Sequence, residues 1–179
     1  MGRTTMNANA ATMANTVPVG DGLIVDVDER TPAWATAVDA PAALCAKAAA
    51  AVYGRVGSGT AAEVSIVLAD DSFVRELNLR YRGKDRATNV LSFPGDAMVP
   101  AGMPAMLGDI AVALETVLGE AAAEDKCAAD HLSHMIVHGM LHLLGFDHED
   151  DKDAEKMESE EIAILGGIGV ENPYRTDGS

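Results

Sequence analysis

Three histidines and a glycine stand close together in the segment IVHGMLHLLGFDH, residues 136–148. His138 and His142 are four residues apart, so a helix places both imidazoles on one face, one turn apart. Gly145 is suited to end that helix, because glycine adopts the left-handed conformation at low cost, and the chain can then return and bring His148 to the same point. Three neutral imidazoles with an open fourth position are typical of a catalytic zinc site, where the pKa of a bound water falls to about 7.

A buried apolar helix that happens to carry histidines is the alternative interpretation. The neighbouring residues are nearly all apolar, and unpaired imidazoles among them would be costly to bury. His131 and His134 precede the group, and because three ligands are already present we expect neither of them to bind the metal. Asp147 either orients a histidine by accepting its second N–H or only stabilises the turn, and both interpretations stay open.

The spacing of these histidines, with the glycine between them, is also that of the metzincin proteases. Those proteases carry a glutamate directly after the first histidine, where it acts as the general base. Here that position is Gly139, and no carboxylate replaces it within the helix. The sequence therefore predicts a metal arranged for hydrolysis, but the missing base weakens the prediction of a protease.

A group of basic residues interrupts an otherwise acidic chain. The net charge is −15, yet five of the thirteen lysines and arginines fall within twelve positions: Arg75, Arg80, Arg82, Lys84 and Arg86. An acidic protein is a poor non-specific ligand for nucleic acid, whereas a local basic cluster can hold one anionic group or a short phosphate backbone. A solvated basic loop is the alternative. Nine acids between residues 147 and 161 follow the third histidine closely.

The periodicity of apolar residues predicts the elements that position these groups. Strands are expected over residues 22–29, 62–70, 90–94 and 107–114. Helices are expected over residues 32–56, 72–82, 115–124, 128–145 and 150–170, with Pro41 near a possible new start. The last two strands are joined without a helix and should be antiparallel. We therefore predict an α+β fold: a mixed, mostly parallel four-stranded sheet with one antiparallel strand, packed with about five helices.

The length of 179 residues suits a single domain, which we expect over residues 21–170. Residues 1–20 contain no apolar run long enough for a signal peptide and no strong periodicity, so we expect a disordered extension there and a flexible tail over 171–179. No stretch is long enough to span a bilayer, which favours a cytoplasmic protein without membrane contact. Cys45 and Cys127 are far apart, and we expect two buried free thiols rather than a disulfide.

In these motifs the chain resembles the YbeY endoribonucleases of bacteria, also called ribosomal RNA maturation factors. HGMLHLLGFDH (138–148) is similar to the family's histidine motif, LNLRYRGKDRATNVLSFP (77–94) to its second motif, and LGDIAVA (107–113) to a third. The three blocks occur in the family's order. Phe146 stands where tyrosine is common in the family and Ala87 where proline is common, and both departures concern packing rather than metal ligands.

The resemblance implies one zinc ion per chain, held by His138, His142 and His148. It implies a zinc-dependent, single-strand-specific cut in RNA, with 3′-end maturation of small-subunit (16S) ribosomal RNA and ribosome quality control as the biological role. Arg82 falls on the family's arginine and is implied to contact RNA phosphate. The implied partners are small-subunit ribosomal RNA, the ribosome with its proteins, and the GTPase Era.

The residue types agree with this implied role and leave its chemistry partly open. The planar guanidinium of Arg82 can hold a phosphate by two charged hydrogen bonds and offset the charge that builds at phosphorus. Ser92 either donates a hydrogen bond to substrate or only belongs to the sheet. Because the sequence shows no general base, the nucleophile is either water or the RNA 2′-hydroxyl. A zinc hydrolase of another bond and a non-catalytic ribosome-assembly factor are the alternative functions.

Overall fold

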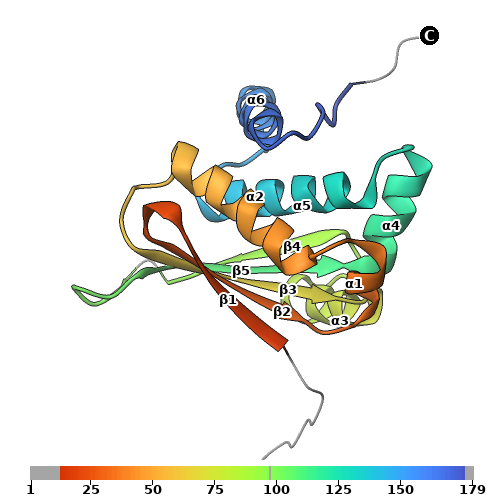
Figure 1. Cartoon of the computed structure of the whole chain (residues 1–179), viewed down its shortest axis with the longest axis horizontal. Helices are drawn as coiled ribbons and strands as arrows, with labels where there is room; N and C mark the ends of the chain where they lie inside the picture. The colour runs from red at the N-terminus through yellow and green to blue at the C-terminus, as the bar shows by residue number, and fades with distance from the viewer. Residues whose placement is uncertain (1–12, 97, 176–179) are drawn as a thin grey trace, which may run out of the picture.

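A computed structural model describes residues 13–96 and 98–175, which form one sheet with helices on both faces (Figure 1). The strands are β1 (Met13–Val19), β2 (Leu23–Glu29), β3 (Ala62–Ala69), β4 (Val90–Pro94) and β5 (Ala105–Ala113). The α-helices are α1 (Ala33–Ala37), α2 (Pro41–Val56), α3 (Asp71–Arg82), α4 (Leu114–Ala123), α5 (Ala128–Leu143) and α6 (Asp151–Gly167). A short 3-10 helix, Gly20–Gly22, joins β1 to β2.

The sheet has the order β1-β2-β3-β5-β4 and confirms the predicted α+β class. Its three central strands, β2, β3 and β5, are parallel, and β4 is antiparallel to β5, as the connection without a helix predicted. All four predicted strands are present. The described residues add a fifth strand and contain six α-helices where about five were expected.

The fifth strand, β1, corrects the prediction that residues 1–20 are disordered. Residues 13–19 pair antiparallel with β2, while residues 1–12 lie outside the described residues. This strand has no apolar pattern of its own, and its order comes from backbone pairing with an edge that β2 would otherwise leave open. Pro18 is compatible with such a strand because an edge tolerates a missing donor. Val17 and Val19 pack against the core.

The single helix predicted over residues 32–56 is two helices, α1 and α2. Ala40 between them has a left-handed φ of 44°. The ring of Pro41 disfavours the helical conformation in the residue before it, so the chain turns at Ala40 and a new helix begins at the proline. The break seats the indole of Trp34 in the core, where its Nε1–H donates to the carbonyl of Ala69 at 3.0 Å.

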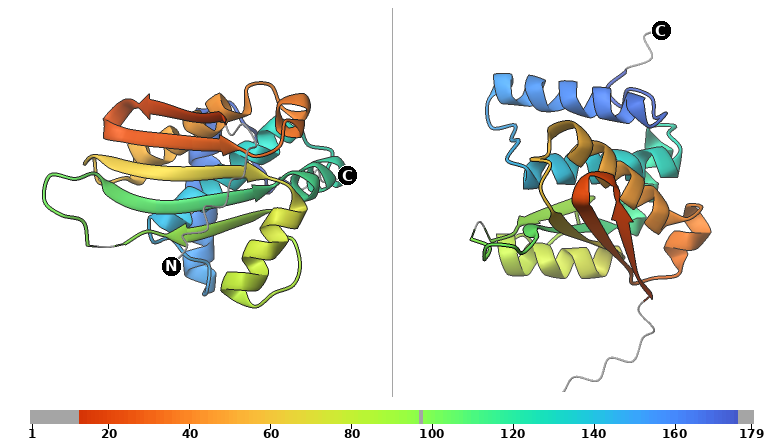
Figure 2. Two further views of the ribbon diagram at one scale, coloured as in Figure 1. Left: turned by 90° about the horizontal axis from the view of Figure 1, so that it is seen from below. Right: turned by 60° about the vertical axis from the view of Figure 1, so that its left-hand side comes forward.

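The helices form layers about the sheet (Figure 2). Helices α2 and α5 cover one face, α3 covers the other, and α6 lies across the outer side of α2 and α5 (Figure 1). Alternate residues of β5 face opposite layers: Ile110 and Val112 join the core beneath α5, whereas Ala111 and Ala113 meet α3. The layer of α5 therefore separates the sheet from α6, and each of its faces is in contact with another element.

Two further sequence predictions concern the cysteines and membrane-spanning segments. Both cysteines are free, but only Cys45 is buried; Cys127 is exposed, against the expectation of two buried thiols. None of the helices in residues 13–96 and 98–175 combines the length and apolar character needed to cross a membrane.

Helix α5 lies close to the sheet at Gly139. A Cβ added there would lie 3.1 Å from Cδ1 and Cγ2 of Ile110 and 3.1 Å from Oγ of Ser92. The Ser92 hydroxyl also donates to the carbonyl oxygen of Gly139 at 3.2 Å. Glycine after the first histidine thus serves helix–sheet packing, and Ser92 has a structural contact with the helix. A larger side chain at this position would have to displace Ile110 and Ser92.

We predict that Gly139→Glu lowers the free energy of unfolding by about 3 kcal/mol or more. Overpacking alone costs about 1–3 kcal/mol, and burial of a carboxylate without a partner adds to that cost. Urea denaturation measures the change. Gly119→Glu is the matched control, since Gly119 is an exposed position on α4 with open space around it. The free energy of unfolding of the control should stay within about 0.5 kcal/mol of the wild-type value. A Gly139→Glu variant as stable as wild type would contradict the packing argument.

Candidate metal centre

Helix α5 and the turn after it bring the three predicted histidines together. His138 and His142 lie one turn apart on α5, and their Nε2 atoms are 3.0 Å apart. Gly145 has a φ of 92°, its N–H donates to the carbonyl of His142 at 3.1 Å, and the N–H of Phe146 donates to that of Leu141 at 3.0 Å. These two bonds form a Schellman motif, which ends the helix and reverses the chain. The reversal places His148 beside the helix.

The three imidazoles have the spacing that a single metal ion requires. One ligand nitrogen from each ring lies within 4.8 Å of the others. Nitrogens bound at about 2.0–2.1 Å to one tetrahedral zinc would be about 3.3 Å apart, so small rotations of the rings suffice. Burial lowers the pKa of His142, and the neighbouring His138 and His148 lower it further. A neutral imidazole is the form that binds a metal.

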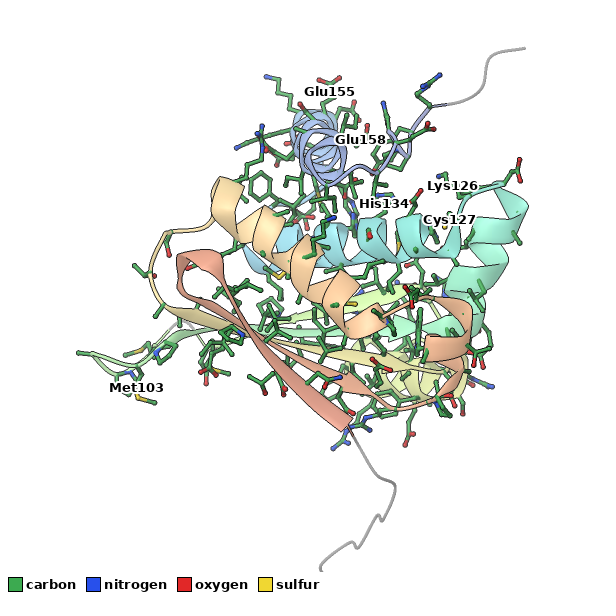
Figure 3. All side chains as sticks on the ribbon, viewed as in Figure 1. Met103, Lys126, Cys127, His134, Glu155 and Glu158 are labelled. Atoms are coloured by element: carbon green, nitrogen blue, oxygen red, sulfur yellow. The ribbon has the colours of Figure 1, made fainter. Side chains whose placement is uncertain are left out.

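The ring of His138 is oriented by a residue that the sequence did not point to. The Nδ1–H of His138 donates to Oε1 of Glu161 on α6 at 2.5 Å, which leaves Nε2 facing His142. Glu161 is fully buried. Its other oxygen, Oε2, accepts from Nε2 of His134 at 3.2 Å and from the hydroxyl of Tyr174. Figure 3 shows His134 on the side of α5 that faces α6.

Glu161 remains charged in this buried position. Burial by itself raises its pKa, but hydrogen bonds from His134, His138 and Tyr174 outweigh burial and leave the pKa at about 2. Burial and the hydrogen bond to Glu161 raise the pKa of Tyr174 in turn. The carboxylate is thus an acceptor that is available to His138 at ordinary pH.

One pattern in the sequence could have identified Glu161. Most acids of α6 face solvent, as Glu155 does in Figure 3. Glu161 instead shares a buried stripe with Met157, Ile164 and Leu165, spaced four, three and four residues away. A glutamate on the apolar stripe of an amphipathic helix is expensive to bury without partners. The cost of burying Glu161 indicates that this residue has partners and a role. The many acids next to it in the sequence make it hard to single out.

The other candidates near the histidines have roles of their own. Nε2 of His131 lies 2.8 Å from Oε2 of Glu120, away from the three-histidine group. His134 contacts Glu161 and is also outside the group. Oδ1 of Asp147 accepts the backbone N–H of His148 at 2.7 Å, which favours the turn-stabilising interpretation of that residue over the histidine-orienting one.

Arg82 faces the same open cleft as the three histidines. The cleft has a volume of about 520 Å³, and its walls include Arg82, Asn89, Ser92, Pro94, Phe146 and Asp147 in addition to the histidines. Nη2 of Arg82 donates to the carbonyl of Ser92 at 3.4 Å, which directs the guanidinium toward β4. Residues 82 and 148 are far apart in sequence. The fold therefore places an exposed guanidinium and the possible metal site on one cavity.

The last turn of α3 and the loop after it position Arg82. Asp70 caps the start of α3 by accepting the N–H of Phe73 at 2.8 Å, and Gly83 ends the helix with a φ of 68°. The buried side chain of Asn78 donates to the carbonyl of Arg86 at 2.8 Å and fixes the loop against the helix.

The basic cluster is smaller than the sequence indicates. Arg75 makes two hydrogen bonds to Asp85, at 2.7 and 3.1 Å, and its charge is largely neutralised. Lys84 and Arg86 are exposed in the loop that follows Arg82. The exposed basic residues that remain are Arg80, Arg82, Lys84 and Arg86, and of these four Arg82 lines the cleft.

Comparison with known proteins agrees with these features. The family model described as Endoribonuclease YbeY matches residues 33–169. Proteins named Endoribonuclease YbeY include one from Azorhizobium caulinodans, 50% identical over 153 residues, which cover 84% of this chain and 95% of the relative. One from Paramagnetospirillum magneticum is 46% identical over 155 residues, covering 84% and 94%, and one from Rhodospirillum rubrum is 44% identical over 170 residues, covering 88% and 84%.

A solution structure of a Thermotoga maritima protein is similar with a TM-score of 0.49 and 25% identity, covering 87% of this chain and 98% of that one. The family assignment comes from the sequence comparisons: the family model spans most of the chain, and the relatives align over nearly their whole length. This chain belongs to the YbeY family of endoribonucleases.

Proposed function

We propose that this protein is a zinc-dependent endoribonuclease that cuts single-stranded RNA. The observation that carries the proposal is the shared cleft, which has the three-histidine group and Arg82 on its walls. Membership of the YbeY family supports the choice of RNA as substrate. The proposed domain includes β1 and extends through α6.

Each residue of the proposed site has one task. His138, His142 and His148 would hold the metal, with His148 the most exposed of them, on the open side. A bound zinc ion supplies a Lewis acid that polarises a phosphoryl oxygen and lowers the pKa of water. Arg82 binds the phosphate and offsets the negative charge that develops in the transition state. Bidentate hydrogen bonds from its guanidinium also fix the orientation of the phosphate.

The biological role we propose is 3′-end maturation of small-subunit (16S) ribosomal RNA and ribosome quality control in the cytoplasm. The small basic surface supports a requirement for partners, because few phosphate contacts give little affinity for naked RNA. The ribosome with its proteins, and the GTPase Era, are the proposed partners. They would supply the selectivity that a short contact with the backbone lacks.

The packing at Gly139 argues against the peptide-bond alternative. In the metzincin arrangement a glutamate at this position acts as the base. Here the space is occupied by Ile110 and Ser92. Arg82 on the same cleft is suited to a phosphate rather than to a peptide bond, and this supports RNA over peptide as the proposed substrate.

Cleavage of a small-subunit ribosomal RNA precursor tests the proposed activity. The zinc-loaded protein should cut the single-stranded 3′ region, and the product ends identify the nucleophile. Attack by the 2′-hydroxyl forms the O2′–P bond and breaks the P–O5′ bond, leaving a 2′,3′-cyclic phosphate and a 5′-hydroxyl. Attack by water breaks the P–O3′ bond, leaving a 5′-phosphate and a 3′-hydroxyl. Intact RNA together with zinc-dependent cleavage of a protein would overturn the proposal.

We predict about one zinc per purified chain, as expected for one three-histidine site. His138→Ala, His142→Ala and His148→Ala should each remove most of it, because two imidazoles bind the ion much less tightly than three. Atomic emission spectrometry of the folded, gel-filtered protein measures the zinc content per chain. His131→Gln is the control on the same helix, since His131 contacts Glu120, and it should keep its zinc. A folded His142→Ala variant with full zinc content would contradict the ligand assignment.

We predict that Arg82→Ala loses at least tenfold in RNA cleavage while keeping zinc content and melting temperature. The side chain is exposed, so its loss removes a phosphate contact and little packing. Arg82→Lys keeps the charge but loses the planar fork and should restore activity only in part. Arg75→Ala, on the same helix but paired with Asp85, is the matched control and should cleave normally. Undiminished cleavage by Arg82→Ala would show that the loop is a solvated bystander.

A further inference from the structure

A cluster of side chains around the buried Glu161, behind the candidate metal centre, joins three separate parts of the chain. Glu161 on α6 contacts His138 and His134 on α5, and it also contacts Tyr174, which lies beyond the end of α6. The rings of His134 and Tyr174 meet edge to face, with centroids 5.6 Å apart. The cluster lies on the opposite side of His138 from its Nε2, so it can act on the metal centre only through that ring.

The hydrogen bond to Glu161 fixes which nitrogen of His138 is free. A neutral imidazole carries one proton, and a carboxylate partner at Nδ1 holds that proton there. Nε2 then has its lone pair exposed toward Nε2 of His142, 3.0 Å away. Without Glu161 the ring could adopt the other tautomer or rotate about its side-chain bonds, and either change would remove a ligand from the group.

The chain beyond α6 is anchored where it meets this cluster. The carbonyl of Pro173 accepts from Nζ of Lys126 at 2.9 Å, and the N–H of Tyr174 donates to the side chain of Asn172 at 2.9 Å. The N–H of Val170 donates to the carbonyl of Leu165 at 2.9 Å as the helix ends. Residues 171–175, the first part of the expected flexible tail, thus hold the phenol against Glu161; residues 176–179 lie outside the described residues.

We infer that Glu161 is the positioning residue that sets the tautomer and orientation of His138, and that Tyr174 holds Glu161 in place, so that the segment after α6 controls metal affinity. The inference rests on the proposed function in that it takes the three-histidine group as the metal site. A buried carboxylate with no such task would be an energetic liability, because an apolar residue of similar size usually stabilises a core as well or better.

Zinc affinity, measured by competition with a chromogenic chelator, tests the inference without using RNA. Glu161→Gln preserves shape but weakens the acceptor, and it should raise the zinc dissociation constant about 10–100-fold, the range seen when partners of metal-binding histidines are changed. Tyr174→Phe removes one of the three donors to Glu161 and should raise it by less. In the double variant the effect of Tyr174→Phe should vanish, because Tyr174 acts through Glu161.

Glu160→Gln is the matched control. Glu160 is the adjacent residue of α6 and pairs with Arg55 near the surface, so the same change of charge there should leave zinc affinity unchanged. Equal weakening by Glu160→Gln would show a general effect of charge on α6 and would overturn the inference. A purely structural role for Glu161 would lower the melting temperature of the metal-free protein and leave the dissociation constant as in wild type, which would also overturn it.

The tautomer of His138 gives a second readout in the metal-free protein. Nitrogen NMR should show the proton on Nδ1 in wild type and a mixture of tautomers in Glu161→Gln. Wild-type zinc affinity in Glu161→Gln would refute the inference and leave the proposed function intact. A wild-type protein that binds no zinc would refute the proposed function, and the tautomer measurement would still decide whether Glu161 positions His138.

Discussion

Helix α5 is held between the sheet and α6, and the candidate metal centre depends on both contacts. On one side Gly139 lets the helix backbone approach Ile110 and Ser92 closely. On the other side the buried Glu161 of α6 accepts a hydrogen bond from the ring of His138. The first contact brings the helix backbone close to the sheet, and the second is the contact through which Glu161 is inferred to orient His138. A helix held on one side alone could shift or let the ring turn, and the ligand atoms would then separate.

A charge at the centre of this arrangement has to be compensated. Transfer of a lone carboxylate from water to a protein interior is costly, and Glu161 is stable there because three donors surround it. Those donors come from α5 and from the segment after α6. The donors that stabilise Glu161 therefore connect the segment after α6 to the candidate metal centre. The histidines come from one helix and one turn, but their surroundings include this distant segment.

The distribution of charge narrows the region where RNA can approach. The pairing of Arg75 with Asp85 leaves Arg80, Arg82, Lys84 and Arg86 as exposed basic residues of the cluster, and Arg82 lines the cleft. Apart from the buried Glu161, most acids of α6 face solvent, and Glu160 forms an ion pair with Arg55. A bound divalent ion would add two positive charges to three neutral imidazoles. An RNA strand bound as proposed would be attracted most strongly between Arg82 and the histidines.

The sequence by itself determined the features that depend on residues close together in the chain. The spacing of His138 and His142, the glycine that ends α5, and the return of His148 are local, because helical periodicity and the left-handed preference of glycine act within a turn or two. The apolar patterns of β2, β3, β4 and β5 and the short link between the last two strands were sufficient for the α+β class and for the antiparallel edge strand.

Only the tertiary structure decided which residues meet when they belong to segments far apart in the sequence. β1 is ordered by pairing with β2 although its own composition is weakly apolar. Gly139 is required by the sheet beneath it, and Glu161, 23 residues after His138, reaches that ring only because α6 packs across α5. Arg82 meets the histidines because the end of α3 and the turn after α5 border one cleft. Such contacts depend on how whole helices and strands pack together. The periodicity of apolar residues within one element does not show which side chains of another element will contact it.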